Sequence, residues 1–231
     1  MIVSDQATPE HFVAKAKQLN LQGVSTLSFP TMARGVLQRN QSAAQEVSQG
    51  ALQEASSRLI ALKVVETGYP LRGQLKVMSD LQAAQNAIAQ NTSDQLAQTT
   101  TNIPAPQTVW AEATTLEALG VQVGDAVMLG SQRFTVSQVL MHEPDRGAGF
   151  MNFAPRVMMR ADELPSTGLI GLGSRVTYRL LIAGQDLQTV DAYERWVSER
   201  IDAQHLRKAL EQTFTYRKTH PLPRTLPEPL A

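Results

Sequence analysis

The pattern of apolar positions at the start of the chain predicts a strand, a helix and a second strand. Thr8 can cap the helix and Pro9 suits its first position, and the apolar residues that follow recur at helical spacing: Phe12, Val13, Ala16 and Leu19. From Val24 to Phe29 the spacing becomes that of a strand, which Pro30 is expected to end or to confine to a sheet edge. With the short strand Ile2–Val3, the opening reads as a β-α-β unit.

The rest of the chain alternates strand patterns with two further helical ones. Helices are predicted over residues 114–119, where Gly120 stops the helix, and over 188–203, which has an amphipathic pattern. The glycines of Gly68–Gly73 bracket a Tyr-Pro pair and predict a hairpin-like reversal between two strands. Strands are predicted over residues 58–66, 74–78, 108–111, 126–129, 134–141, 156–160 and 174–182. This mixture predicts an α+β fold with two lobes of mixed sheet and packed helices.

Two polar stretches and a proline-rich end divide the chain. Residues 38–57 and 80–101 are rich in Gln, Ala and Ser and have no strong apolar face. We interpret them as solvated insertions that are partly helical or mobile, with a polar interaction surface as the alternative. The predicted plan begins with a first α+β lobe at 1–78, which contains the insertion 38–57, and continues with a Gln/Ala-rich insertion and linker at 79–106. An inserted second lobe follows at 107–170, and a final strand and helix at 171–205 return to the first lobe. Residues 206–231 are predicted to form a mobile Pro-rich tail.

Composition excludes several classes of function. Lys+Arg and Asp+Glu each total 21 and no basic run is present, so general binding to nucleic acid or to an anionic membrane is not expected. Cysteine is absent, which excludes disulfides, thiolate metal sites and cysteine nucleophiles. The chain shows neither a secretion signal nor an apolar run approaching the ~20 residues of a membrane span. It is therefore either a cytosolic protein or a portion whose membrane segments lie outside it.

The sequence contains no recognisable motif for catalysis or metal binding. The segment His142–Arg146 begins like the zinc-protease motif H-E-x-x-H, but Arg146 stands where the second histidine is needed and Pro144 opposes a helix. An ion pair among the loop residues Glu143, Asp145 and Arg146 is the preferred interpretation, with a partner contact as the alternative. The sequence has no G-x-S-x-G elbow, no G-x-G-x-x-G and no Walker sequence. We therefore predict no catalytic, cofactor-binding or metal-binding residue, no cofactor and no enzymatic activity.

Three segments carry a resemblance to a known family. Leu27–Met32 is followed by Gly68–Gly73, within the longer stretch 62–75, and then by Glu143–Gly147, within a block that runs from residue 116 to residue 181. In these residues, and in this order, the chain resembles the periplasmic domain of FtsX/MacB-like ABC-transporter permeases of the YbbP type. The resemblance covers roughly residues 2–201 outside the two Gln-rich stretches.

The resemblance implies a location, a fold and partners. It implies a MacB-like α+β domain at the periplasmic face of the bacterial inner membrane, joined to the transmembrane part of the same permease. A separate cytoplasmic ABC ATPase subunit, which this domain does not contact, would drive the motion of the outer domain. Genes of this permease type commonly lie beside one for a periplasmic thioesterase/lysophospholipase. The resemblance therefore also implies that enzyme as a partner, and lipids or other hydrophobic compounds as substrates.

Three functional hypotheses follow. The first is a periplasmic domain that transmits ATP-driven motion and docks partners or hydrophobic substrate, with the contacts on two loops: Tyr69, Leu71 and Arg72 on one, Glu143, Asp145, Arg146 and Phe150 on the other. The alternative for each residue is turn formation or local ion pairing. The second hypothesis is a module that itself binds a lipid or another hydrophobic ligand in an apolar groove, with core packing as the alternative role of its residues: Leu71, Met78, Phe150, Met151 and Phe153. The third, an independent hydrolase, lacks a nucleophile that the sequence can name.

Overall fold

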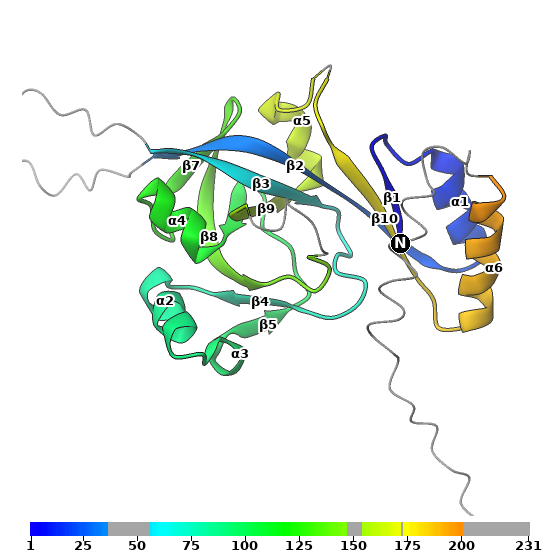
Figure 1. Ribbon diagram of the computed structural model, residues 1–231, viewed down its shortest axis with the longest axis horizontal. Helices are drawn as coiled ribbons and strands as arrows, with labels where there is room; N and C mark the ends of the chain where they lie inside the picture. Colours follow the sequence, from blue (N-terminus) through cyan, green and yellow to red (C-terminus); the bar gives the residue numbers. More distant parts are fainter. Residues whose placement is uncertain (37–55, 147–153, 172, 201–231) are drawn as a thin grey trace, which may run out of the picture.

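The computed structural model describes residues 1–36, 56–146, 154–171 and 173–200 (Figure 1). Its strands are β1 Ile2–Ser4, β2 Gln22–Val36, β3 Ser57–Val65, β4 Leu75–Met78, β5 Gln98–Thr100, β6 Thr108–Ala111, β7 Ala126–Leu129, β8 Gln132–His142, β9 Arg156–Arg160 and β10 Thr177–Ala183. Its helices are α1 Glu10–Gln18, α2 Leu81–Ala89, α3 Ser93–Leu96, α4 Ala113–Leu119, α5 Leu164–Thr167 and α6 Leu187–Ser198. The predicted α+β class is confirmed. In the described part of the chain, no helix is long and apolar enough to cross a membrane.

Six of the strands close into a barrel. Around the ring, β2 pairs with β3, β3 with β9, β9 with β6, β6 with β8, β8 with β7, and β7 again with β2. The largest core cluster takes apolar side chains from all six strands, among them Phe29, Ile60 and Phe134, so it fills the inside of the ring. Helix α4 adds Leu116 and Leu119 to this core. Strand β4 continues the sheet outward from β8 and carries β5 at its edge.

A smaller lobe stands beside the barrel and contains both α1 and α6 (Figure 1). Strand β10 lies between β1 and β2 and is antiparallel to both, so β1 and β2 run in the same direction on either side of it. The two helices pack together over a second apolar cluster, in which the Tyr193 hydroxyl donates a hydrogen bond to the Phe12 carbonyl at 3.0 Å. The strand-helix-strand opening predicted from the sequence is therefore present, with the last strand inserted into it.

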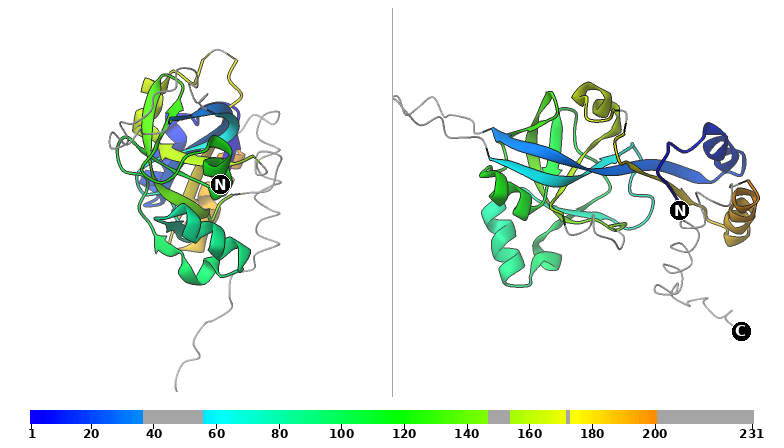
Figure 2. Two further views of the ribbon diagram at one scale, coloured as in Figure 1. Left: turned by 90° about the vertical axis from the view of Figure 1, so that its left-hand side faces the viewer. Right: turned by 45° about the horizontal axis from the view of Figure 1, so that its top comes forward.

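Strand β2 is shared by the two lobes. Its first half pairs with β10, and its second half pairs with β3 and β7 of the barrel. Figure 2 shows this long strand running from the barrel into the lobe of α1 and α6. One sheet therefore passes through both lobes. The residue boundaries proposed between the lobes remain a prediction.

Pro30 neither ends β2 nor restricts it to the edge of the whole sheet, contrary to the sequence-based expectation. The residue opposite it in β3, Ala61, donates its N–H away from β2, to the Pro155 carbonyl. Pro30 therefore occupies a pair without ladder hydrogen bonds to β3. On the other edge of β2, the pairing with β10 stops at Ser28 and the pairing with β7 starts at Ala33, so the nitrogen of Pro30 faces a position where β2 has no partner strand. The missing N–H donor breaks no hydrogen bond at that position.

Two local predictions were wrong, and two lie largely outside the described residues. The Gly68–Gly73 turn does not join a hairpin, because both edges of β3 are occupied by β2 and β9 while β4 pairs with β8 and β5. Pro9, rather than Thr8, takes the N-cap position of α1, and no side chain caps that helix. The insertion 38–57 lies outside the described residues except for Ser56 and Ser57, at the start of β3, and the tail 206–231 lies entirely outside them.

The Gln/Ala-rich stretch 80–101 forms α2, α3 and β5. The Asp80 carboxylate accepts a hydrogen bond from the Ala83 N–H at 2.7 Å and so caps α2. Ala84 is buried on the barrel side of this helix, where its small size lets α2 lie close to the core. The stretch was predicted to have no strong apolar face, and a narrow face of alanines is sufficient to seat it.

Candidate functional site: two loops joined by a buried charge network

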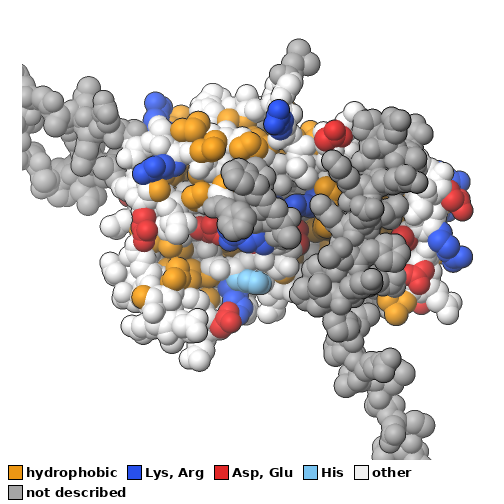
Figure 3. Space-filling view, in the orientation of Figure 1, with side chains coloured by type: hydrophobic (Ala, Val, Ile, Leu, Met, Phe, Trp, Pro, Cys, Tyr) orange, Lys and Arg blue, Asp and Glu red, His pale blue; other side chains and the backbone are white. Residues whose placement is uncertain are grey.

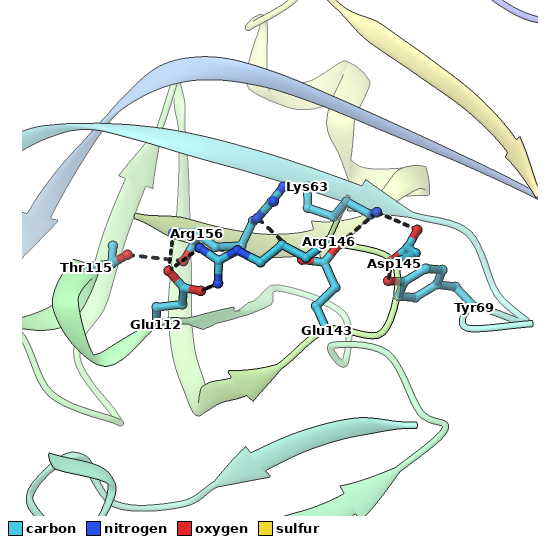
Figure 4. A network of polar contacts seen from close by, with 8 residues as sticks. All are labelled: Lys63, Tyr69, Glu112, Thr115, Glu143, Asp145, Arg146 and Arg156. Carbon is cyan, nitrogen blue, oxygen red and sulfur yellow. Dashed lines mark hydrogen bonds and ion pairs between the residues drawn. The ribbon is translucent and has the colours of Figure 1, made fainter. Parts of the chain in front are cut away.

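The two loops that carry the family resemblance lie against each other. One follows β3 and contains Gly68–Gly73, and the other follows β8 and contains Glu143–Arg146. The Tyr69 hydroxyl donates a hydrogen bond to the Asp145 carboxylate across the two loops (Figure 4). Gly73 has a φ of +73°, and a Cβ at that position would lie only 2.9 Å from Cβ of Pro144. A side chain there would force the loops apart, so glycine permits both the turn and the contact.

Lys63 of β3 lies at the centre of this contact. Its Nζ is 2.9 Å from Glu143 Oε1 and 2.9 Å from Asp145 Oδ2, and its side chain is 0% exposed. The same ammonium lies 5.1 Å from the centre of the Tyr69 ring, within the range of a cation–π contact. Because an isolated buried ammonium is very costly, the two carboxylates are what allow a lysine on this strand.

Arg156 of β9 extends the network toward α4. Its Nε is 3.4 Å from Glu143 Oε2, and both side chains are 2% exposed. The Glu143 oxygens meet their two cations as charge contacts rather than as well-aligned hydrogen bonds. The Arg156 backbone N–H donates to Glu112 Oε2 at 3.0 Å, and Arg146 pairs with the same Glu112 carboxylate. The network therefore ties β3, β9, both loops and the start of α4 together.

Burial and charge shift the pKa values of the two groups that join the loops. Burial alone would raise the pKa of Asp145, but the Lys63 ammonium and hydrogen bonds from Tyr69 and Lys63 outweigh it, so the pKa is lowered. Burial raises the pKa of Tyr69 well above its usual range, and the negative charges of Glu143 and Asp145 raise it further. Asp145 is thus an anion and Tyr69 a neutral donor at all physiological pH values.

The contacts in this arrangement hold the two loops together. Its charged side chains balance, with Lys63, Arg146 and Arg156 set against Glu112, Glu143 and Asp145 (Figure 4). Each side chain is held by the others, which fixes the loops in place. Over the described residues, no group of three or more His, Asp or Glu side chains is arranged to hold a metal ion.

The structure separates the predicted contact residues by exposure. Tyr69 and Glu143 are buried inside the network, so neither offers a surface to a partner in this conformation. Asp145 and Arg146 are half-buried, Leu71 and Met78 are half-buried against the core clusters, and Arg72 is exposed. Phe150, Met151 and Phe153 lie outside the described residues. The role of the whole set as partner or ligand contacts therefore stays a prediction.

The expected ion pair within the 143–146 loop is replaced by longer-range pairs. Glu143 and Asp145 pair with Lys63, and Arg146 pairs with Glu112, all from other parts of the chain. Sequence reasoning missed Lys63, Glu112 and Arg156 as members of the site. Only Lys63 gave a signal, because it is a charge inside the otherwise apolar run Leu59–Val65.

A cavity of about 510 Å³ opens beside the first loop, where the α1–β2 and β10–α6 turns approach it. Leu71 and Arg72 line it together with Leu19, Leu21, Gly184 and Asp186. Arg72 reaches across to the Gly184 carbonyl at 3.4 Å. Asp186 faces the cavity with its carboxylate already accepting from the Gln188 and Thr189 N–H groups and from the Thr189 hydroxyl.

Comparison with known proteins identifies one curated relative. Over 94 residues the chain is 32% identical to the uncharacterized ABC transporter permease YbbP of Escherichia coli (strain K12). The chain resembles that permease. The matched residues make up 41% of this chain and 12% of YbbP, so the match covers only a small part of YbbP, which is a much longer protein. No protein-family model matches the chain. The resemblance to YbbP-type permeases predicted from the sequence is thus confirmed by a direct match.

Two solved structures are similar in arrangement to most of the chain. The extracellular domain of the noncanonic ABC-type transporter YknZ from Gram-positive bacteria matches 84% of this chain and 87% of its own, with a TM-score of 0.44 and 11% identity. The periplasmic region of MacB from Actinobacillus actinomycetemcomitans matches 92% of this chain and 91% of its own, with a TM-score of 0.43 and 11% identity.

Proposed function

We propose that the chain is the periplasmic domain of an ABC-transporter permease of the YbbP type, which transmits ATP-driven motion and docks partners outside the inner membrane. The observation that carries this proposal is the 32% identity to the permease YbbP over 94 residues. The domain itself would carry out no chemical reaction. Its partners would be the transmembrane part of the same permease, a cytoplasmic ABC ATPase that it does not touch, and a periplasmic thioesterase/lysophospholipase.

Two features of the fold support a mechanical role. Strand β2 belongs to both lobes, so a displacement of the α1–α6 lobe is passed to the barrel through a continuous hydrogen-bonded ladder. The charge network also holds the loop after β3 and the loop after β8 to the barrel wall. A body that transmits motion must resist deformation, and paired buried charges together with a closed barrel provide that resistance.

Cysteine labelling tests the location. In the complete reading frame with any other cysteines removed, a Leu96→Cys variant in intact spheroplasts should react with a membrane-impermeant maleimide, because Leu96 is 60% exposed. The matched control is Ala84→Cys, a buried position on the neighbouring helix, which should react only after denaturation. The chain's own lack of cysteine makes the labelling specific.

Labelling at Leu96→Cys that required permeabilised membranes would rule out a periplasmic location, and a complete reading frame without apolar spans would do the same.

Transmission of motion adds a second requirement. The distances from spin labels at exposed Lys17 of α1 and at exposed Leu96 of α3 to a label on the membrane segment should change with the nucleotide state of the partner ATPase. If all of these distances stayed constant through the ATPase cycle, the mechanical role would be lost.

A second candidate function, direct binding of a hydrophobic ligand, is supported by the cavity beside Leu71 and Arg72. Its volume of about 510 Å³ and its leucine side chains suit a small amphiphile. Titration of the chain with dodecyl maltoside below its micelle concentration should shift the methyl resonances of Leu19, Leu21 and Leu71 together. A Leu71→Asp variant should abolish these shifts. Uniform shifts over the whole surface, unaffected by this variant, would eliminate the cavity as a ligand site.

A further inference from the structure

The outer face of the barrel carries an uncovered apolar and basic patch where β2, β3, β7 and β8 run side by side. We call it the barrel patch, and its residues are Pro30, Met32, Arg34, Leu59, Met128 and Arg133. Met32 lies directly opposite Leu59 in the ladder of β2 and β3, and the two side chains are 53% and 59% exposed. Figure 3 shows apolar side chains gathered between basic ones over this end of the molecule.

Strand register places these residues on one surface. Arg34 of β2 is opposite Met128 of β7, and Met128 is opposite Arg133 of β8. Directly opposed residues of antiparallel strands share a face, so Arg34, Met128 and Arg133 form a row across three strands. Met32 lies two residues before Arg34 and therefore points to the same side. The intervening residue, Ala33, is buried in the barrel core, which confirms that the patch faces outward.

The chemistry of the barrel patch is that of a protein interface. Methionine, arginine and leucine around a proline give an adaptable apolar centre, and interfaces are enriched in methionine and arginine while they are poor in lysine and acidic residues. Arg34 and Arg133 are exposed, and no ion pair joins either of them to a carboxylate anywhere in the described chain. Four other arginines of the described chain do pair with carboxylates, namely Arg146, Arg156, Arg160 and Arg200.

From this pattern we infer that the barrel patch docks a second protein, whose surface presents Asp or Glu carboxylates around an apolar side chain. Arginine pairs with carboxylates in a bidentate geometry, which would fix the orientation of the partner, and the Met32–Leu59 pair would supply the apolar contact. The inference rests on the proposed function in one respect. The lobe of α1 and α6 contains Met1 and the last described residues, whereas the patch lies on the barrel (Figure 1). If membrane spans continue from that lobe, the patch lies on the part of the domain farther from the bilayer.

Site-specific cross-linking tests the inference in the native cell. The photo-reactive amino acid p-benzoylphenylalanine would be placed at Leu59 or at Met32 in the complete permease, and at Leu96 as a control of equal exposure on α3. Leu59 and Met32 should form one heterologous protein adduct that Leu96 does not form. Mass spectrometry of the adduct should locate the attachment next to one or more carboxylates on the partner.

A charge exchange then distinguishes docking from incidental proximity. Arg34→Glu should lower the yield of the adduct by roughly tenfold or more through like-charge repulsion, whereas Arg34→Lys should retain most of it. Lys17→Glu, the same change of charge on α1, should leave the yield unaltered. Reversal of the identified partner carboxylate to arginine should restore the adduct in the Arg34→Glu background.

Three kinds of cross-linking product would overturn the inference. These are adducts to lipid, adducts to a second copy of this chain, and a protein adduct whose yield does not respond to Arg34→Glu. A complete lack of adduct at Leu59 and Met32 in an assembled permease would also overturn it. External labelling of Leu96→Cys is measured in the same cells, so failure of the patch is distinguishable from failure of the proposed location.

Discussion

Replacing Lys63 by methionine is expected to lower the free energy of unfolding by about 3–5 kcal/mol, the usual effect of removing one partner from a buried ion pair. The ammonium lies 2.9 Å from each of two carboxylates and is fully buried. Without it, Glu143 would keep only Arg156 at 3.4 Å, and Asp145 would keep the Tyr69 hydroxyl. Urea denaturation followed by circular dichroism at neutral pH measures the difference.

A matched control is available on β4. Lys76 pairs with Asp94 on the surface, where the Asp94 side chain is 87% exposed, so Lys76→Met should have a much smaller effect than Lys63→Met. A double variant, Lys63→Met with Asp145→Asn, should recover part of the stability that Lys63→Met loses, because it also removes the carboxylate that Lys63→Met leaves with the Tyr69 hydroxyl alone. If Lys63→Met cost no more than Lys76→Met, the charge network would not be what fastens the two loops.

Stability should fall steeply in alkaline solution, and Tyr69→Phe should reduce that fall. Burial raises the pKa of Tyr69 well above its ordinary value of 10.0 and raises the pKa of Tyr193 to about 12. In the unfolded chain both phenols lose their protons near pH 10, whereas in the folded protein they keep them. The contribution of each tyrosine is therefore fully present below pH 10 and decreases as the pH rises above it.

The expected slope is about 1.4 kcal/mol per pH unit for each retained proton, or roughly 2 kcal/mol for Tyr69 between pH 10 and pH 11.5. In Tyr69→Phe the loss between these pH values should be smaller by that amount, and Tyr193→Phe should give a smaller reduction, because the pKa of Tyr193 is raised less. Both variants are measured by urea denaturation at half-unit intervals from pH 8 to pH 11.5. An unchanged alkaline slope in Tyr69→Phe would mean that another group of the network causes the loss.

The alternation of apolar and polar residues was sufficient to predict most secondary structure. The strands at 108–111 and 156–160 occur where the pattern placed them, and Gly120 ends α4 with a φ of +68°. These features depend on residues that are neighbours in the sequence. Pro30 shows the limit of that reasoning, because a proline ends a strand only if its missing N–H was needed there. Whether it was needed depends on β10 and β7, which follow more than ninety residues later in the chain.

The resemblance selected both loops correctly as notable segments but could not show that they meet. Tyr69 and Asp145 are 76 residues apart, and Lys63 and Asp145 are 82 apart. Their contact depends on β3 and β9 pairing in parallel and on the loop after β8 reaching Lys63 of β3. From the resemblance, Tyr69 and Glu143 were predicted to be surface contacts, whereas both are buried. A sequence motif does not reveal on which side of a loop its residues are buried.

By itself the sequence determined the class of fold, the absence of cysteine chemistry, the balance of charge and the resemblance to a permease. All of these depend on composition or on short segments that keep their character in any surroundings. Only the tertiary structure decided that six strands close into a barrel, that Lys63 and Arg156 share Glu143, and that Met32, Leu59 and Arg34 form one exposed face. Those properties arise from pairings between distant segments, because the burial and charge of a side chain depend on which strands lie beside it.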